Sequence, residues 1–477
     1  MKRSMFSRAR IVLTLLVLIA LAACAPPLEQ PVAQSTDSRP AGSLSVDDLL
    51  ANLDALQGGA AQGVASSGRS VVSTAAGQQL SLTDVAAYLN TIKPGLGNAV
   101  KAHGPYLVLP VPVPAYPSKN AKGDAVTLSG LMWVPVTFGR PSSLPVIAFQ
   151  HGTQVYRPSA PSRFNLNPLA VFSSPDQSGA FQNYVECIVG GLMASAGYIV
   201  VMPDYPGFGS NTDDHPFVHM SLGNSVRDLV LAASHAQLFG GLKANGKIYL
   251  TGYSEGGYVT IAGAQALQAA GVPINGIVPC DGPYSLSQVM LAQMTTSGLK
   301  LLVPSYALYT GFGYHSVYPA DFDFGFFFQD KYAAMLPDLF NGTHTNAEVG
   351  AAVPAGLSPA DSILTPAAVA GLLGQSIPAF GDLKANDSFR SIADGTSIWV
   401  PSAQLYFIHC PVDDVVPYQN ALDAVDALNT ADGLNLTITN VQPVPFVAQV
   451  LGSNHVAAFP TAMLAAFTRI DGLNRAP

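Results

Sequence analysis

The five residues Gly252-Tyr253-Ser254-Glu255-Gly256 form a G-x-S-x-G pattern, which is typical of a serine that acts as a nucleophile. An apolar run, KIYLT at 247–251, precedes the pattern, and a run rich in small residues, 256–270, follows it. We therefore expect a strand, a tight turn and a helix, the context in which this pattern exposes a serine hydroxyl. At the start of a helix that hydroxyl lies in a positive field that stabilises a developing oxyanion.

Strands and helices must alternate along the chain to position such a turn. Short, wholly apolar runs predict strands that are buried on both faces of a sheet. The expected strands are 106–113, 125–136, 144–149, 198–202, 247–251, 274–279, 404–408 and 436–441. The expected helices are 183–196, 224–238, 256–270, 419–428 and 460–470. This alternation predicts an α/β fold with a mostly parallel central sheet flanked by helices.

The segment 283–399 interrupts the alternation, and we expect it to be largely helical. Between positions 301 and 340 it holds 12 of the 42 aromatic residues of the chain. Two interpretations stay open: these side chains line a pocket for an apolar substrate, or they form the core of the segment itself. The run Phe326-Phe327-Phe328 is too continuous for one helix face, so we expect part of it to be exposed.

Three further motifs stand at the ends of expected strands. Gln150-His151-Gly152-Thr153 follows the third strand, Asp204 opens a D-x-x-G-x-G turn after the fourth, and Asp413 opens a D-x-x-V-P turn after the seventh. Together with the turn around Ser254, these motifs give the chain a pattern that resembles the α/β-hydrolase superfamily. Exported bacterial carboxylester hydrolases and secretory lipases are the members that it resembles most.

The resemblance covers the chain from about 106 to 472, apart from the segment 283–399. It implies an α/β-hydrolase core in two parts, 69–282 and 400–477, interrupted by that segment. In this fold an insertion after the sixth strand forms a cap or lid above the nucleophile. We therefore expect 283–399 to be a cap.

The resemblance also implies a catalytic triad with Ser254 as the nucleophile. The order of the superfamily is nucleophile, acid, histidine, and His455 is the one histidine after the expected acid. The D-x-x-V-P spacing favours Asp413 as that acid, which must lie buried beside the histidine to orient it. Asp414 in the same turn and Asp281 after the sixth strand remain alternatives.

In the same superfamily an oxyanion hole is built from two backbone N–H groups. Here the resemblance implies the N–H groups of Thr153 and Glu255, and which residue of the turn 152–154 donates stays open. We interpret His151 and Asp204 as structural residues of their turns, without a chemical role.

These features together imply a serine carboxylester hydrolase, lipase-like or esterase-like, that acts on apolar acyl or aromatic esters through an acyl-enzyme. The substrate is then a small-molecule or lipid ester, and no metal or cofactor is required. A serine peptidase of the same fold is an alternative, because Gly257 after Gly256 also resembles the elbow of such peptidases. Another alternative is an envelope lipoprotein that keeps the fold without catalysis.

The first residues of the chain carry signals for export. The basic residues Lys2, Arg3, Arg8 and Arg10 precede an apolar run, 11–22, of 12 residues. This run is too short to span a bilayer of about 30 Å and is typical of a signal peptide. Leu21-Ala22-Ala23-Cys24 resembles the lipobox of bacterial lipoproteins. It implies a signal peptide over 1–23, lipidation of Cys24, and anchoring in the cell envelope, at the outer membrane if the host has one.

The segment 24–68 follows this signal. Its sequence predicts a flexible tether with a short helix over 46–56. From residue 24 onward the chain holds 18 basic and 30 acidic residues, a net charge of −12. This balance argues against a nucleic-acid-binding protein, which needs a basic surface.

Three cysteines remain beyond Cys24, and their spacing does not resemble a zinc site. They are Cys187, Cys280 and Cys410, which permit one disulfide at most. Because Cys280 and Cys410 follow strands that should be neighbours, a disulfide between them is a hypothesis.

Overall fold

The computed structural model describes residues 108–136, 142–167, 169–236, 238 and 241–475. The expected signal peptide, Cys24 and the tether 24–68 lie outside these residues. In the described part of the chain, no helix is long and apolar enough to cross a membrane.

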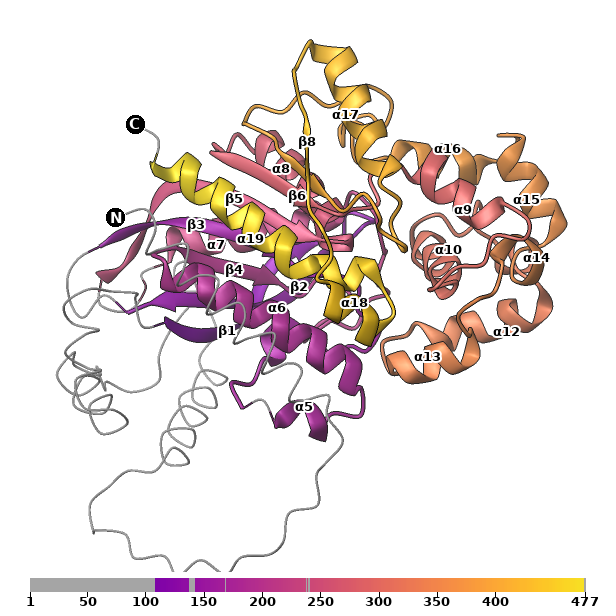
Figure 1. Cartoon of the computed structure of the whole chain (residues 1–477), viewed down its shortest axis with the longest axis horizontal. Coiled ribbons are helices and arrows are strands. Elements are labelled where there is room, and N and C mark those ends of the chain that lie inside the picture. The colour runs from indigo at the N-terminus through magenta and orange to yellow at the C-terminus, as the bar shows by residue number, and fades with distance from the viewer. Residues whose placement is uncertain (1–107, 137–141, 168, 237, 239–240, 476–477) are drawn as a thin grey trace, which may run out of the picture. The chain divides into compact units, whose positions relative to one another are not determined.

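An eight-stranded sheet forms the centre of the fold, with the strand order β1-β2-β4-β3-β5-β6-β7-β8 (Figure 1). β2 runs antiparallel to β1 and β4, and all other neighbouring strands are parallel. The strands are β1 (Val108–Lys119), β2 (Ala125–Pro135), β3 (Ser143–Gln150), β4 (Ile199–Pro203), β5 (Lys243–Tyr253), β6 (Gly276–Cys280), β7 (Phe407–His409) and β8 (Ile438–Asn440). The mostly parallel sheet that the sequence predicts is therefore confirmed.

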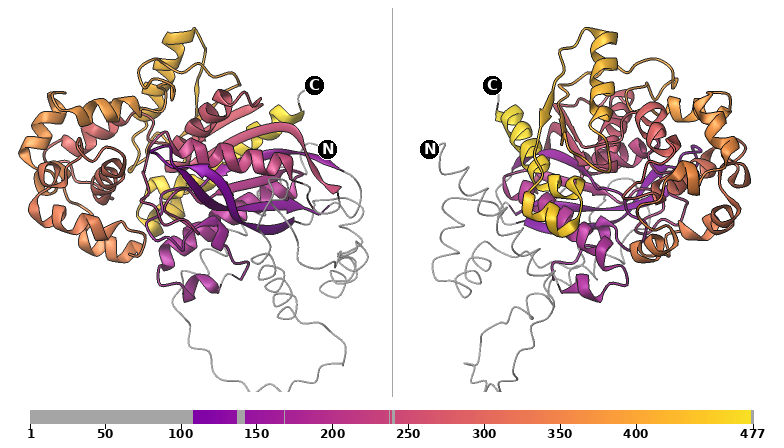
Figure 2. Two further views of the ribbon diagram at one scale, coloured as in Figure 1. Left: turned by 180° about the vertical axis from the view of Figure 1, so that it is seen from behind. Right: turned by 45° about the vertical axis from the view of Figure 1, so that its right-hand side comes forward.

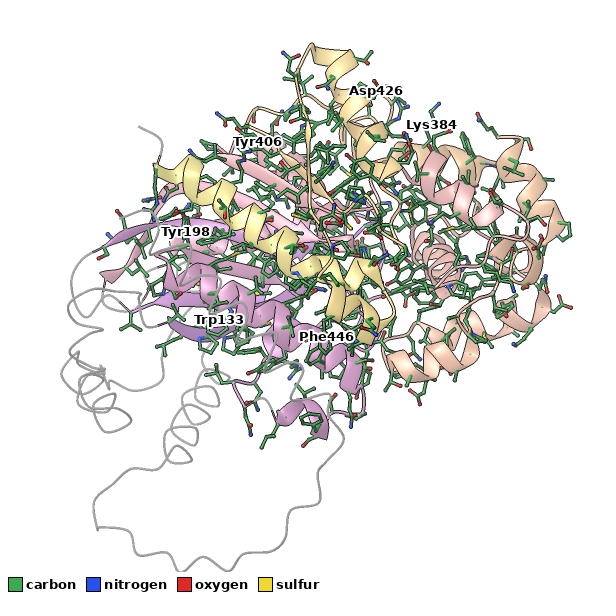
Figure 3. The ribbon with its side chains drawn as sticks, viewed as in Figure 1. Trp133, Tyr198, Lys384, Tyr406, Asp426 and Phe446 are labelled. Atoms are coloured by element: carbon green, nitrogen blue, oxygen red, sulfur yellow. The ribbon has the colours of Figure 1, made fainter. Side chains whose placement is uncertain are left out.

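Two apolar layers cover the two faces of this sheet, because side chains alternate along each strand. Ile147 and Phe149 of β3 belong to the layer that contains α6 (Gln177–Ser195) and α19 (Asn454–Arg475). Trp133 and Tyr198 lie in the same layer (Figure 3). The alternate residues of β3 face the layer that contains α7 (Leu222–His235), α8 (Glu255–Ala269) and α17 (Gln419–Asp432).

Between β6 and β7 the chain forms helices and two isolated bridges instead of strands. Figure 2 shows these helices gathered at one end of the sheet. They are a π-helical turn (Leu286–Met290), α9 (Leu291–Thr295), α10 (Ser305–Val317), α11 (Phe324–Phe327), α12 (Asp330–Leu339), α13 (Asn346–Ala352), α14 (Pro359–Ser362), α15 (Pro366–Leu373) and α16 (Pro378–Ala385).

Most aromatic residues of this insertion pack against one another. The rings of Tyr309 and Phe340 stack 4.5 Å apart, and those of Phe322 and Phe327 stack 5.1 Å apart. Phe326 is 40% exposed, whereas the two phenylalanines that follow it are buried. The insertion thus has an aromatic core of its own, and packing accounts for most of the aromatic enrichment.

The last two helices differ from the expectation. A short helix, α18 (Pro445–Leu451), follows β8, and α19 begins at Asn454 instead of residue 460. Pro460, the first residue of the expected helix, lies inside α19, where its missing N–H deprives only the carbonyl of Val456 of a partner.

The disulfide hypothesis is wrong, because Cys187, Cys280 and Cys410 are free and buried. Cys280 lies opposite Ile408 in the register of β6 and β7, so Cys410 is offset by two residues, or about 6.6 Å, along the strand. This offset adds to the lateral spacing of about 4.8 Å between strands. The two Cα atoms are then farther apart than the roughly 6.8 Å that a disulfide allows.

Candidate active site

Ser254 occupies a strained turn between β5 and α8. β5 ends at Tyr253, α8 begins at Glu255, and Ser254 between them has φ +61° and ψ −125°. Glycine is required beside it, because a Cβ atom at Gly256 would lie 2.1 Å from the carbonyl oxygen of Gln150. A serine with positive φ is costly and persists where the surrounding structure enforces it, as at functional sites.

Ser254, His455 and Asp413 form one chain of hydrogen bonds. His455 Nε2 lies 2.9 Å from Ser254 Oγ, and His455 Nδ1 lies 2.6 Å from Asp413 Oδ2. Ser254 is 9% exposed and His455 is 7% exposed, so these contacts are largely shielded from water. His455 lies in the first turn of α19, whereas the sequence placed it in a loop before the helix.

Asp413 and Asp414 have different partners although they are adjacent. Asp413 Oδ1 accepts the N–H groups of Val415 and Val416, at 2.9 and 2.7 Å, which leaves Oδ2 for the histidine. Asp414 accepts the Ser453 hydroxyl and the backbone N–H groups of residues 454 and 455 at the start of α19. Asp414 thus holds the helix that carries His455, a role that the sequence does not reveal.

Asp281, the third candidate acid, lies in the same buried region. Its Oδ1 accepts the N–H of Cys410 at 2.8 Å, and its side chain is fully buried. Burial, and then the charge of Asp413, raise the pKa of Asp281 well above its ordinary value. The structure pairs Asp413 with the histidine, and Asp281 makes no hydrogen bond to His455 among the described residues.

One group of described side chains could share a metal ion by distance alone. It consists of Asp281, His409 and Asp413, whose possible ligand atoms lie within 4.8 Å of one another. Their hydrogen bonds fit a metal site poorly. His409 Nε2 lies 3.0 Å from the carbonyl oxygen of Val416, which can only accept, so this nitrogen carries a proton. Both carboxylate oxygens of Asp413 already have hydrogen-bond partners, namely two backbone N–H groups and His455.

The two expected oxyanion donors flank Ser254. Thr153 and Glu255 line the same small cavity as Ser254. Within the described residues, no hydrogen bond occupies the backbone N–H of either one. Both groups are therefore free to donate to an oxygen atom bound beside Ser254 Oγ.

The side chain of Glu255 makes a buried pair that the sequence does not indicate. Glu255 Oε1 lies 2.7 Å from Nε2 of His215, and both side chains are at most 3% exposed. Nδ1 of His215 lies 2.9 Å from the carbonyl oxygen of Pro206. The pair fixes Glu255 to the loop after β4, and a separation of 40 residues leaves no local sequence signal for it.

His151 and Asp204 have structural contacts. The ring of His151 stacks on Tyr205 at 4.0 Å, and burial lowers its pKa. Asp204 accepts the Ser129 hydroxyl at 2.6 Å and the N–H of Ser162 at 2.8 Å. Both side chains tie together the turns near Ser254 and contact neither Ser254 nor His455 through a described hydrogen bond.

Comparison with known proteins locates this arrangement in a known fold. The sequence profile of the secretory lipase family matches residues 175–278, which include the turn around Ser254. A putative hydrolase from Legionella pneumophila is 23% identical with a TM-score of 0.61, over 83% of this chain and 95% of that one. The rice cell wall degrading esterase LipA from Xanthomonas oryzae is 20% identical with a TM-score of 0.62, over 81% and 94%. The fold is that of the α/β-hydrolases.

A third structure, Candida antarctica lipase A in its closed state, is 20% identical to this chain with a TM-score of 0.54. The likeness covers 72% of this chain and 73% of that one. The comparison with curated proteins finds no match.

The cavity that Ser254 lines is small and mostly apolar. Its volume is ≈ 30 Å³, the space of about one or two water molecules. The core contributes Thr153, Phe217, Val218, Glu255 and Val416, and the insertion contributes Leu286, Met290, Met294, Tyr306 and Thr310. Tyr306 is the only one of the 12 aromatic residues between 301 and 340 in this described lining.

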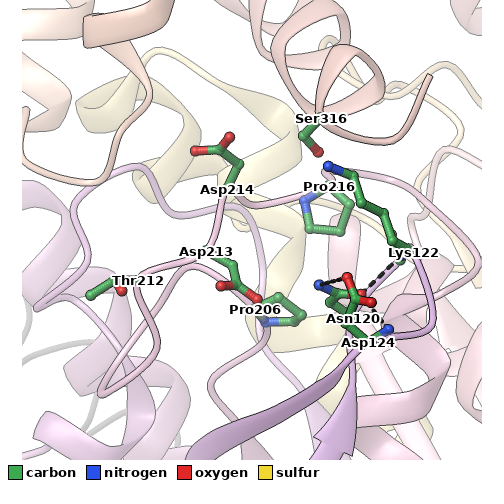
Figure 4. Close-up of a pocket in the computed structure, with 10 residues that line it drawn as sticks. Asn120, Lys122, Asp124, Pro206, Thr212, Asp213, Asp214, Pro216 and Ser316 are labelled. Carbon is green, nitrogen blue, oxygen red and sulfur yellow. Dashed lines mark hydrogen bonds between the residues drawn. The ribbon is translucent and has the colours of Figure 1, made fainter. Parts of the chain in front are cut away.

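A larger cavity of ≈ 310 Å³ lies elsewhere, beside the turn between β1 and β2 (Figure 4). The ten residues drawn around it are mostly polar, and they include Asp213, Asp214 and Lys122 but no histidine. Its one serine, Ser316, donates its hydroxyl to the carbonyl of Gly313. Ser316 therefore has neither a free hydroxyl hydrogen nor a histidine beside it in this lining.

A reaction that uses neutral His455 as its base is expected to become faster as pH rises, with a midpoint above 6.5. Burial alone would lower the pKa of His455, but the charge and hydrogen bond of Asp413 outweigh burial and raise that pKa. A general base must be neutral, so kcat/KM increases as the imidazolium loses its proton. The measurement is kcat/KM from pH 5 to 9, with the folded fraction followed in the same buffers.

A second group titrates in the same range and needs a control. Burial raises the pKa of Glu186, on α6, to about 7. The variant Glu186→Gln removes this titration, and the midpoint assigned to His455 should persist in it. A midpoint below 6.5 in both proteins would contradict the assignment.

Proposed function

We propose that this chain is a serine hydrolase of carboxylic esters, of the lipase or esterase type. The observation that carries the proposal is the hydrogen-bonded series Ser254, His455 and Asp413 at the base of an apolar cavity. The match of residues 175–278 to the secretory lipase family supports the same reaction.

The proposed reaction follows from the contacts of these side chains. Ser254 Oγ attacks the ester carbonyl while His455 Nε2 takes its proton, and the backbone N–H groups of Glu255 and Thr153 hold the oxyanion. His455 then gives the proton to the leaving alkoxide. Water enters and hydrolyses the acyl-enzyme by the same steps. Asp413 holds His455 in the required tautomer and stabilises the imidazolium.

The apolar lining of the cavity favours esters with an acyl chain or an aromatic group. A volume of ≈ 30 Å³ admits no such substrate, so we propose that the segment 283–399 is a cap that must move for an ester to enter. Met290 and Met294, which reach the cavity from this segment, have flexible side chains that can adjust to different acyl groups.

A panel of substrates tests this function against a peptidase of the same fold. The panel contains p-nitrophenyl esters from acetate to palmitate and aminoacyl p-nitroanilides. We expect kcat/KM for the best ester to exceed that for any anilide by at least about a thousandfold, since the cavity lining offers little charge to recognise a peptide terminus. Anilide cleavage at a rate equal to or above ester cleavage would favour the peptidase.

We also propose that the chain is exported and anchored to the cell envelope by a lipid on Cys24. The proposal is supported by the basic start, the apolar run of 12 residues and the lipobox-like sequence that ends at Cys24. Cell fractionation of wild type and Cys24→Ser tests it. The wild type should remain with membranes, and equal release of both proteins from washed membranes would refute the anchor.

A further inference from the structure

The turn between β3 and α6 that carries Thr153 is held by two side chains of α6. Glu186 Oε1 accepts the backbone N–H of Gly152 at 3.1 Å. Gln182 Nε2 donates to the carbonyl of Thr153 at 3.3 Å and to Glu186 Oε1 at 3.2 Å. The two side chains therefore fix the peptide groups on both sides of the Thr153 N–H.

The two side chains approach position 152 so closely that a Cβ atom there would force them to shift by a few tenths of an ångström. A Cβ atom there would lie 3.0 Å from Gln182 Nε2 and 3.1 Å from Glu186 Oε1. Glu186 is 4% exposed, and its Oε2 is buried without a hydrogen-bond partner in the described part of the chain. A buried carboxyl group with one free oxygen is expensive to keep for packing alone.

The insertion also contacts this turn. Tyr309 of α10 donates its hydroxyl to the carbonyl of Gln154 at 3.0 Å, and the backbone N–H of Arg157 donates to the carbonyl of Gly342 at 2.8 Å. These contacts are at risk whenever the insertion moves to admit a substrate. The contacts from α6 are not, because α6 packs on the sheet through residues such as Cys187 and Met193.

We propose that Gln182 and Glu186 are positioning residues that keep the Gly152 and Thr153 peptides oriented for the oxyanion while the insertion is displaced. This inference rests on the proposed function, since the oxyanion forms only if Ser254 attacks a carbonyl. A carboxyl group that is partly neutral is compatible with a position near the oxyanion. Burial raises the pKa of Glu186 to about 7, so part of the population is neutral near neutral pH. A permanent negative charge there would oppose the oxyanion.

The test compares four full-length proteins: wild type, Glu186→Leu, Glu186→Gln and Asn183→Leu. Glu186→Leu removes the acceptor for Gly152 N–H, whereas Glu186→Gln keeps an acceptor oxygen without the charge. Asn183 is the matched control, because it lies on the same helix, is 6% exposed and donates to the carbonyl of Ala160, away from Gly152.

We expect Glu186→Leu to lower kcat/KM for the best ester by about 10- to 100-fold, less than the loss of a whole oxyanion donor, with KM nearly unchanged. A trifluoromethyl ketone should lose affinity by the same factor. Ser254 Oγ adds to its carbonyl, the proton passes to His455, and the carbonyl oxygen becomes an oxyanion in the hole. Glu186→Gln should recover most of the activity, and Asn183→Leu should keep kcat/KM within about twofold of wild type.

Hydrogen exchange of the backbone at 150–157 gives a readout that does not depend on activity. Exchange should be faster in Glu186→Leu than in Asn183→Leu at equal global stability. Equal exchange, or a Glu186→Leu protein as active as wild type, would overturn the inference. If the wild type cleaves no ester but exchange responds as expected, the positioning role stands and the proposed function fails.

Discussion

Replacing Ser254 by alanine is expected to lower kcat on the best ester at least about a thousandfold, and by as much as about 10⁶-fold. The reason is that Ser254 Oγ is the atom 2.9 Å from His455 Nε2, and alanine leaves the histidine with no nucleophile to deprotonate. What remains is the contribution of binding and of the oxyanion hole. The measurement is the steady-state hydrolysis of a p-nitrophenyl ester, with protein concentrations high enough to detect residual rates.

Ser316→Ala is a matched control for this variant. Ser316 lies by the larger cavity and donates its hydroxyl to a backbone carbonyl, so its loss should leave ester hydrolysis within about twofold. A fluorophosphonate provides a second measurement, because it labels an activated serine covalently. We expect labelling of wild type and Ser316→Ala and none of Ser254→Ala. If wild type itself is not labelled, the chain is better explained as a non-catalytic lipoprotein.

The core of the fold could be predicted because its signals are local. Runs such as 144–149 and 247–251 are apolar without interruption, and each proved to be part of a strand buried at the centre of the sheet. The turn around Ser254 could be recognised from the sequence as well, because its glycines lie within five residues of one another. Larger residues in their place would collide with the backbone of the turn and of the neighbouring strand. Hydrophobic periodicity and the positions of glycines predict secondary structure and turns within short stretches of the chain.

The contacts that hold the candidate site could not be predicted, because they join distant parts of the chain. His215 meets Glu255 across 40 residues, and Glu186 meets Gly152 across 34. Glutamate is mostly exposed in proteins and histidine is intermediate, so nothing in the composition marks these residues as buried partners. The start of α19 was misplaced for a related reason: Asp414 supplies hydrogen bonds to it from 40 residues away.

The largest remaining effect concerns Asp413, the acid of the proposed triad. Asp413→Asn should lower kcat by about 10⁴-fold, because an amide that donates to His455 Nδ1 favours the wrong tautomer of the imidazole. Asp414→Asn should cost less than about tenfold in kcat. Asp414 acts on the start of α19 through Ser453 and backbone N–H groups, and the loss of a helix cap is worth about 1 kcal/mol of stability.

Asp281→Asn completes the comparison, because burial and then the charge of Asp413 raise the pKa of this carboxyl group and so disfavour its charged form. We expect this variant to stay within about tenfold of wild type, since asparagine can still accept the N–H of Cys410. All three substitutions are nearly isosteric, so a large difference among them measures the role of each carboxylate and not its volume. Were Asp414→Asn or Asp281→Asn to lose more activity than Asp413→Asn, the acid would have to be reassigned.

The pH dependence of activity in Asp413→Asn tests the same assignment, because the pKa of His455 should shift in a known direction. The charge of Asp413 opposes the effect of burial on His455, so Asp413→Asn should lower the pKa of that histidine. The residual activity would then reach its plateau at a lower pH than in wild type. In wild type the raised pKa of His455 also means that its pairing stabilises the fold below about pH 6.5, and this stability is lost as pH rises through the folded-state pKa. Thermal unfolding from pH 5 to 9 should show that loss in wild type and a smaller one in Asp413→Asn. A plateau that stays at the wild-type pH would mean that another carboxylate sets the charge on His455.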